Sequence, residues 1–220
     1  MNRTLGLLFV ILILGFASCS PVTLVKPLEK NQKAVTASLG GPMIVYSDLP
    51  IPIPFCNAGF SYGINSRVTA SAQLGLTSLA FGVFQLDPGI LYGIQMPENN
   101  NQIGVSAFGK THFMFDKWEG NFRWYPELGI QTYKEWGKNL AYLGASGWFE
   151  TRYPAEQRAA GNVWVPMLNF GYTRQNTKWN LTAEAKWIAP NISKEDIVVD
   201  FIGPGTHGAL GLYFGLVRKF

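Results

Sequence analysis

Apolar and polar residues alternate along most of this chain with a period of two. The clearest segment runs over Arg67–Thr77, where even positions are apolar and odd positions are polar or glycine. Successive side chains of a strand point to opposite sides, so this period predicts a β-strand with one apolar face. The same alternation recurs over Asn121–Glu135, Trp179–Trp187 and Leu210–Phe220. We therefore predict an all-β fold with no long helix.

Weaker alternating segments raise the expected number of strands to about eight to ten. They are Lys33–Gly41, Ala58–Ile64, Leu79–Leu86, Ile103–Phe115, Leu140–Phe149 and Trp164–Thr173. Some connections are short and rich in turn formers, and four are long: Pro42–Phe55, Asp87–Asn101, Thr151–Asn162 and Ala189–His207. Short turns at one end and long loops at the other are typical of a membrane barrel. Asp87–Asn101 falls at the short-turn end, so we expect a miscounted strand near Leu79–Leu91.

The first residues predict export. Arg3 precedes the apolar run Leu5–Ala17, which is shorter than the roughly 20 residues that a helix needs to span a bilayer. The run ends in Phe16-Ala17-Ser18-Cys19, which resembles a bacterial lipobox, although Phe16 stands where Leu is usual. The resemblance implies cleavage before Cys19 and its acylation with diacylglycerol. The alternative is an ordinary signal peptide, with Cys19 incidental.

These features divide the chain into a signal peptide over 1–18, a tether over 19–32 and a barrel over 33–220. The tether is polar and broken by prolines, which leaves no room for a helix. With Cys19 acylated, Cys56 is the only remaining thiol, so no intramolecular disulfide is expected.

Composition favours a barrel in a membrane over a soluble one. Only 15% of residues are charged and 47% are hydrophobic, whereas soluble domains have about 25% charged residues. The net charge of +4, which falls to +3 when Arg3 is removed with the signal peptide, is too small to indicate nucleic acid binding. Trp179 and Trp187 lie on one face eight residues apart, which suits the two aromatic girdles that flank an apolar band of about 25 Å.

The C-terminus carries a second resemblance. Leu212, Phe214, Leu216 and Phe220 form an alternating apolar strand that ends in Phe. This pattern resembles the last strand of Gram-negative outer-membrane β-barrels, which the barrel-assembly machinery reads, although Arg218 departs from it. The resemblance implies a closed antiparallel up-and-down transmembrane β-barrel. The rival fold is a lipocalin-like lipid-binding lipoprotein, which lacks support from a Gly-X-Trp motif near residue 35 or a C-terminal helix.

Catalytic chemistry has one candidate residue. His112 shares a face with Ser106 and Lys110, so we expect its side chain to point inward. Some outer-membrane barrels that hydrolyse acyl chains use a serine with a histidine base. The His-X-Ser arrangement of those families is absent, since position 114 is Met. We favour a lumenal histidine in a polar network, assign no catalytic residue, and expect no metal site and no cofactor.

We therefore expect a non-catalytic outer-membrane barrel lipoprotein with a structural or accessory role in an envelope complex. The alternatives are a lipid-modifying barrel enzyme, such as an acyl hydrolase or deacylase, and a narrow channel. The expected partners are outer-membrane lipids, the barrel-assembly machinery and, through the long loops, other envelope proteins. The basic tether gives no sign of export to the cell surface, so we expect Cys19 to anchor on the periplasmic side.

Overall fold

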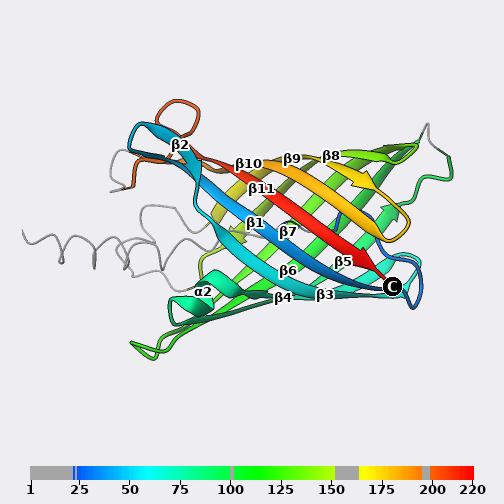
Figure 1. Cartoon of the computed structure of the whole chain (residues 1–220), viewed down its shortest axis with the longest axis horizontal. Coiled ribbons are helices and arrows are strands. Elements are labelled where there is room, and N and C mark those ends of the chain that lie inside the picture. The colour runs from blue at the N-terminus through cyan, green and yellow to red at the C-terminus, as the bar shows by residue number, and fades with distance from the viewer. Residues whose placement is uncertain (1–21, 23, 100–101, 152–163, 195–198) are drawn as a thin grey trace, which may run out of the picture.

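The computed structural model describes residues 22, 24–99, 102–151, 164–194 and 199–220. Ten strands close into one antiparallel barrel (Figure 1). They are β1 (Lys33–Tyr46), β3 (Phe55–Asn65), β4 (Val68–Gly75), β5 (Val83–Gln95), β6 (Ile103–Asp116), β7 (Phe122–Trp136), β8 (Asn139–Phe149), β9 (Trp164–Gln175), β10 (Trp179–Ser193) and β11 (His207–Lys219). Each pairs with its neighbours in the sequence, and β1 closes the barrel by pairing with β11 from Ala34↔Lys219 to Pro42↔Gly211.

Two further elements lie at one end of the barrel. The short strand β2 (Leu49–Pro52) pairs only with β1 and makes a hairpin that extends it, and the helix α2 (Leu76–Ala80) connects β4 to β5. Among the described residues no helix is long and apolar enough to cross a bilayer.

The outer wall is apolar and the lumen is polar. Along β10, Leu181 is 57% exposed on the outside, while Asn180, Thr182, Glu184 and Lys186 are buried on the inside. A soluble barrel would reverse this arrangement, because its exposed face must meet water. The closed barrel satisfies strand hydrogen bonds internally, as hydrocarbon requires. The fold is therefore the predicted up-and-down transmembrane β-barrel, with ten strands and not the eight of a lipocalin.

The two ends of the barrel differ in the length of their connections. At the turn end, which holds the start of β1 and the C-terminus, β7 and β8 are joined by Gly137-Lys138 alone. The opposite end, the loop end, holds α2, the β1–β2 hairpin, the β6–β7 connection and the strand ends that flank the β8–β9 and β10–β11 connections (Figure 1). Short and long connections are both present, but they do not separate completely between the ends: the β5–β6 connection at the turn end, residues 96–102, is longer than the β6–β7 connection at the loop end, residues 117–121.

One predicted connection is a strand. The expected loop Asp87–Asn101 is mostly β5, which leaves only residues 96–102 between β5 and β6. The expected strand Leu79–Leu86 is instead the end of α2 and the start of β5. Asp87-Pro88-Gly89 looks like a turn in sequence, but β5 pairs with β4 throughout it. Against β6 the pairing stops at Leu86↔Phe113 and resumes at Gly89↔Lys110, since Pro88 has no N–H to donate.

The two prolines inside other strands occupy similar places. Pro126 precedes the first β7–β8 pair, Glu127↔Trp148, and Pro166 precedes the first β9–β10 pair, Met167↔Ile188. Each therefore lies where a ladder with the following strand begins, in agreement with the expectation that both would lie at strand ends or bulges.

Candidate functional site

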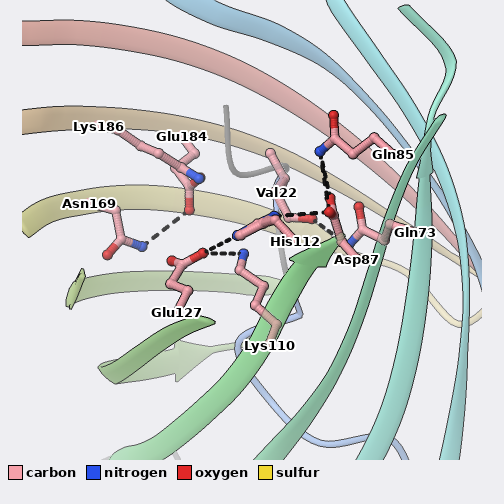
Figure 2. Close-up of polar contacts among 10 residues, drawn as sticks. All are labelled: Val22, Gln73, Gln85, Asp87, Lys110, His112, Glu127, Asn169, Glu184 and Lys186. Carbon is pink, nitrogen blue, oxygen red and sulfur yellow. Dashed lines mark hydrogen bonds and ion pairs between the residues drawn. The ribbon is translucent and has the colours of Figure 1, made fainter. Parts of the chain in front are cut away.

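The polar lumen centres on His112, an inward residue of β6 that is completely buried. Its Nδ1 lies 2.9 Å from Oδ1 of Asp87 on β5, and its Nε2 lies 2.9 Å from Oε2 of Glu127 on β7 (Figure 2). The ion pair with Asp87 falls where Pro88 interrupts the β5–β6 ladder. Gln85 donates from Nε2 to both carboxylate oxygens of Asp87, at 3.2 and 3.0 Å.

Further charged side chains continue this layer across the lumen. Lys110 Nζ lies 3.2 Å from Oε2 of Glu127, and Lys186 Nζ lies 3.1 Å from Oε1 of Glu184. The other oxygen of Glu184 accepts hydrogen bonds from Tyr142 at 2.6 Å and from Asn169 at 3.2 Å. We call Asp87, Lys110, His112, Glu127, Glu184 and Lys186 the charge layer.

The charge layer balances when His112 is protonated. Its three carboxylates then face three cations, and both ring nitrogens of His112 can donate to carboxylate oxygens only in the imidazolium form. Buried charges are costly unless they are paired and hydrogen-bonded, so six charges within one barrel require this balance. Its ion pairs join β5, β6 and β7 through His112 and Lys110, and Glu184 joins β10 to β8 and β9 through Tyr142 and Asn169.

Below the charge layer the lumen holds the described part of the predicted tether. We call Val22 and residues 24–32 the lumenal segment. It enters at the turn end, where the N–H of Asn31 donates to the carbonyl oxygen of Gly63 at 2.8 Å and the N–H of Gly63 to that of Gln32 at 2.9 Å. Its apolar side chains are buried: Val25 packs with Tyr133, Leu140 and Tyr142. The described part of the tether therefore lies inside the barrel and not in solvent outside it.

Polar contacts fix the lumenal segment to the wall. The N–H of Leu28 donates to Oγ1 of Thr69 at 2.8 Å, and Oγ of Ser106 donates to the carbonyl oxygen of Val25 at 2.6 Å. Near the charge layer, Nε2 of Gln73 lies 3.5 Å from the carbonyl oxygen of Val22 (Figure 2). The prolines were expected to exclude a helix, and the backbone of the segment is instead bonded to side chains of the wall.

Small inward residues make room for this segment. A Cβ on Gly63 would overlap the carbonyl oxygen of Glu29, and one on Gly215 would approach Cγ1 of Val22 to 2.9 Å. The space that remains lies mainly at the turn end, where a cavity of about 440 Å³ separates the segment from Thr173, Asn180 and their neighbours on the wall. Two cavities that border Lys110 hold only about 30 and 10 Å³, so space beside the charge layer is nearly filled.

His112 is placed where it was expected, and its surroundings limit its chemistry. Both of its nitrogens face carboxylates, and Oγ of the inward Ser106 is bonded to the lumenal segment, so neither residue is set to activate the other. Met114 points inward at the position where a serine would complete the His-X-Ser arrangement. Among the described residues no group of three or more His, Cys, Asp or Glu side chains is arranged to hold a metal ion.

The other predicted site residues lie on the outer wall or outside the described part. Phe214 and Leu216 face outward, Leu212 is half-buried on the same face, and Phe220 is 64% exposed at the turn end. Trp179 is outward at the turn end of β10, with the guanidinium of Arg218 5.2 Å from its ring centroid, and Trp187 is half-buried. Their girdle and assembly roles stay predictions. Cys19 lies outside the described residues.

Besides His112, the alternation of apolar and polar residues predicts that Lys110, Glu127, Glu184 and Lys186 point inward. It does not predict Asp87, the sixth member of the charge layer. The missed signal was alternation across the proline: Gln85 and Asp87 share the inward face of β5. Asp87 meets His112 only because the two strands are antiparallel neighbours in this register, which a single sequence does not display.

No protein-family model matches the sequence, and no curated protein is similar to it. Solved barrels are similar in shape. An outer membrane channel from Pseudomonas putida F1 is 10% identical, with 92% of this chain and 100% of that chain covered and a TM-score of 0.49. The translocator domain of the autotransporter NalP from Neisseria meningitidis is 9% identical, with 88% and 90% covered and a TM-score of 0.45. The outer membrane protease OmpT from Escherichia coli is 8% identical, with 90% and 99% covered and a TM-score of 0.40. The architecture rests on this chain's own strand pairing.

Proposed function

We propose that this chain is a non-catalytic lipoprotein barrel of a Gram-negative outer membrane, with a structural or accessory role in an envelope complex. The observation that carries the proposal is the nearly filled lumen at the charge layer, where the cavities beside Lys110 hold only about 30 and 10 Å³, with the lumenal segment occupying part of the space below it. A channel needs a continuous aqueous path, and an enzyme of the expected kind needs a histidine with a free nitrogen beside a serine. The described lumen favours neither.

Placement in the outer membrane is supported by the apolar outer wall and by the two unlike ends. In outer-membrane barrels short turns face the periplasm, so we assign the turn end to that side. The assignment puts both Lys33, the first residue of the barrel, and Phe220 in the periplasm. We include in the same proposal the expected recognition of the last strand, which ends in Phe220, by the barrel-assembly machinery.

The loop end offers the surface for a partner protein. Tyr46 and Leu49, at the tip of the β1–β2 hairpin, are 65% and 64% exposed. The other edge of β1 is covered by the β10–β11 connection, since the N–H of Ile202 donates to the carbonyl oxygen of Met43 at 2.9 Å and Ile44 pairs with Phe201. Phe201 and Ile202 of that connection are therefore half-buried against β1, and the hairpin tip is the more exposed candidate for contact with another envelope protein.

Acylation at Cys19, with the anchor in the periplasmic leaflet as the sequence suggested, remains part of the proposal. Cys19 lies outside the described residues, and the lumenal segment begins three residues after it, at Val22.

Planar-bilayer recordings test the proposal. Full-length refolded protein, with closure of the barrel checked by heat-dependent electrophoretic migration, should show no stepwise conductance, because the charge layer leaves almost no space in the lumen. Boiled protein from the same preparation is the control for leaks caused by detergent or lipid. Discrete, reproducible openings from the folded barrel alone would contradict a closed lumen and favour the narrow channel.

A further inference from the structure

The cavity of about 440 Å³ at the turn end has a polar wall. Thr36 on β1 and Asn180 on β10 both pair with Val217 of β11, one from each side, so the three residues form one row across the barrel wall. Thr36 and Asn180 are each 7% exposed and line the cavity. Thr182, the next inward residue of β10, and Thr173 of β9 extend the polar wall. A molecule in the cavity would therefore meet polar side chains from β1, β9 and β10.

Two polar atoms of this wall have no partner. Oγ1 of Thr36 and Oδ1 of Asn180 are buried, and neither makes a hydrogen bond within the described part of the chain. Their neighbours Thr173 and Thr182 differ, because the hydroxyls of these two residues bond to each other at 2.9 Å. Most buried polar groups in folded proteins have a hydrogen-bond partner. The amide oxygen can accept a hydrogen bond and the hydroxyl can donate or accept one, so both can bond to a molecule in the cavity.

The charges around the cavity cancel. Lys26, Lys219 and Glu29 line it, and the ammonium group of Lys26 is paired with Glu135 at 2.8 Å. Lys219 and Glu29 then contribute one charge of each sign. A charged ligand would lose its hydration without meeting a net opposite charge, so the lining suits an uncharged ligand.

The lumenal segment adds apolar side chains to the lining. Leu24 and Leu28 line the cavity together with Val217 of the wall, and the three side chains pack in one cluster. Small-molecule sites combine such an apolar lining with a few polar groups that fix the orientation of the ligand. Their volumes are about 300 to 1,000 Å³, a range that includes this cavity.

The cavity is reached from the turn end. Its lining includes Asn176 and Thr177, in the connection from β9 to β10. Toward the loop end, the spaces beside Lys110 hold only about 30 and 10 Å³. A ligand would therefore enter at the turn end and go no further than the charge layer.

We propose that this cavity is a binding site for a small uncharged molecule with several hydroxyl groups, of the class of a sugar or polyol. A hydroxyl group both donates and accepts, so it can bond to Oγ1 of Thr36 and to Oδ1 of Asn180. The C–H groups of the same molecule pack on Leu24 and Val217. The site goes beyond the proposed function and does not depend on the lipid anchor, and it holds a ligand without conducting it.

Saturation-transfer NMR tests the site. The refolded full-length barrel is prepared in lauryldimethylamine oxide, a detergent without a sugar headgroup, and glucose and sorbitol are the probes. Glucuronate and glucosamine, which add a negative or a positive charge to the glucose ring, test the expected preference for an uncharged ligand. Boiled protein in the same detergent is the control for transfer from micelles. We expect transfer from the folded barrel to an uncharged probe and weaker transfer to the two charged ones.

Variants locate the bound probe. Thr36→Val combined with Asn180→Leu removes both unpartnered atoms at nearly constant volume, and binding should weaken by about tenfold, the loss expected for two hydrogen bonds. Leu24→Trp fills the cavity from the lumenal segment without changing the wall, and it should weaken binding as well. Thr111→Val, on the outer face of β6, is the matched control and should bind as the unchanged chain does. Heat-dependent migration confirms that each variant has folded.

Transfer to neither glucose nor sorbitol would overturn the inference. Stronger transfer to glucuronate or glucosamine would overturn the uncharged class of ligand, and undiminished transfer in the cavity variants would place the probe elsewhere. Bilayer recordings of the same samples separate this inference from the proposed function, because they report conduction and the NMR spectra report binding. A barrel that binds glucose and also conducts would keep the site and contradict the closed lumen, whereas a silent barrel that binds no probe would do the reverse.

Discussion

The two levels of the lumen are closed by different means. At the charge layer, long inward side chains pair within two groups of neighbouring strands, β5–β7 and β8–β10, and leave cavities of only about 30 and 10 Å³ beside Lys110. Toward the turn end, much of the wall presents short inward side chains, and the lumenal segment fills the space that they leave. These short inward residues include Ala34, Ser61, Gly63, Thr69 and Ser106. The comparison shows that inward residue size decides whether side chains or a length of backbone fills a narrow barrel.

The two levels also differ in the forces that hold them. The charge layer is electrostatic and almost free of solvent, so each member depends on its partners. The lumenal segment is held by apolar burial and a few hydrogen bonds, and its ion pair between Lys26 and Glu135 is partly exposed, with 40% of the lysine side chain accessible. Removal of one charge should therefore lower the free energy of unfolding far more in the charge layer than at the lumenal segment.

Two glutamates of β7 provide the largest expected contrast. Glu127→Gln leaves Lys110 and His112 without their shared carboxylate, so the free energy of unfolding should fall by about 3 to 5 kcal/mol, the usual cost of breaking a buried ion pair. Glu135→Gln removes the exposed pair with Lys26 and should cost less than about 1 kcal/mol. Urea unfolding of the refolded barrel, followed by tryptophan fluorescence, measures both, and equal losses would erase the distinction between the levels.

Substitutions at two glycines test the packing of the lumenal segment, with a smaller expected loss of stability than Glu127→Gln. Gly63→Ala places a methyl group against the carbonyl oxygen of Glu29, so it should destabilise the barrel by about 1 to 3 kcal/mol, as overpacking does, or displace the lumenal segment. Gly109→Ala, on the outer wall, meets only the flexible end of Leu128 and should change little. Urea unfolding and limited proteolysis of the segment are the readouts. If Gly63→Ala left the free energy of unfolding unchanged and the segment stayed resistant to proteolysis, the contact between Gly63 and Glu29 would not be as tight as the structure indicates.

The sequence predicted the strands of the barrel and their apolar faces better than the residues that occupy the lumen. Alternation placed the faces of β7, of β10 as far as Trp187 and of β11 correctly, because their pairing with the neighbouring strands is continuous over these residues. It failed at β5, where Asp87-Pro88-Gly89 has the composition of a turn, and the strand is nevertheless kept by its pairing with β4 and by the ion pair of Asp87 with His112. Local propensity was overridden there by contacts between neighbouring strands.

The candidate site was predictable only in part. His112, Lys110, Glu127, Glu184 and Lys186 follow from alternation as inward residues, but their pairing depends on register. The lumenal segment was missed because Pro21 and Pro27 exclude regular structure and the charges of Lys26 and Lys30 suggested a solvated tether. A signal was present in the three-residue spacing of Val22, Val25 and Leu28, which are all buried.

The occupied lumen is tested most directly by thiol labelling of the segment. In a Cys56→Ser background, Val25→Cys replaces a side chain that is 6% exposed among Tyr133, Leu140 and Tyr142, and Trp118→Cys provides an exposed control at the loop end. A bulky polyethylene-glycol maleimide should label Trp118→Cys in the folded barrel and Val25→Cys only after boiling. Labelling of both folded variants at the same rate would show that the segment lies outside the barrel and would contradict the closed lumen.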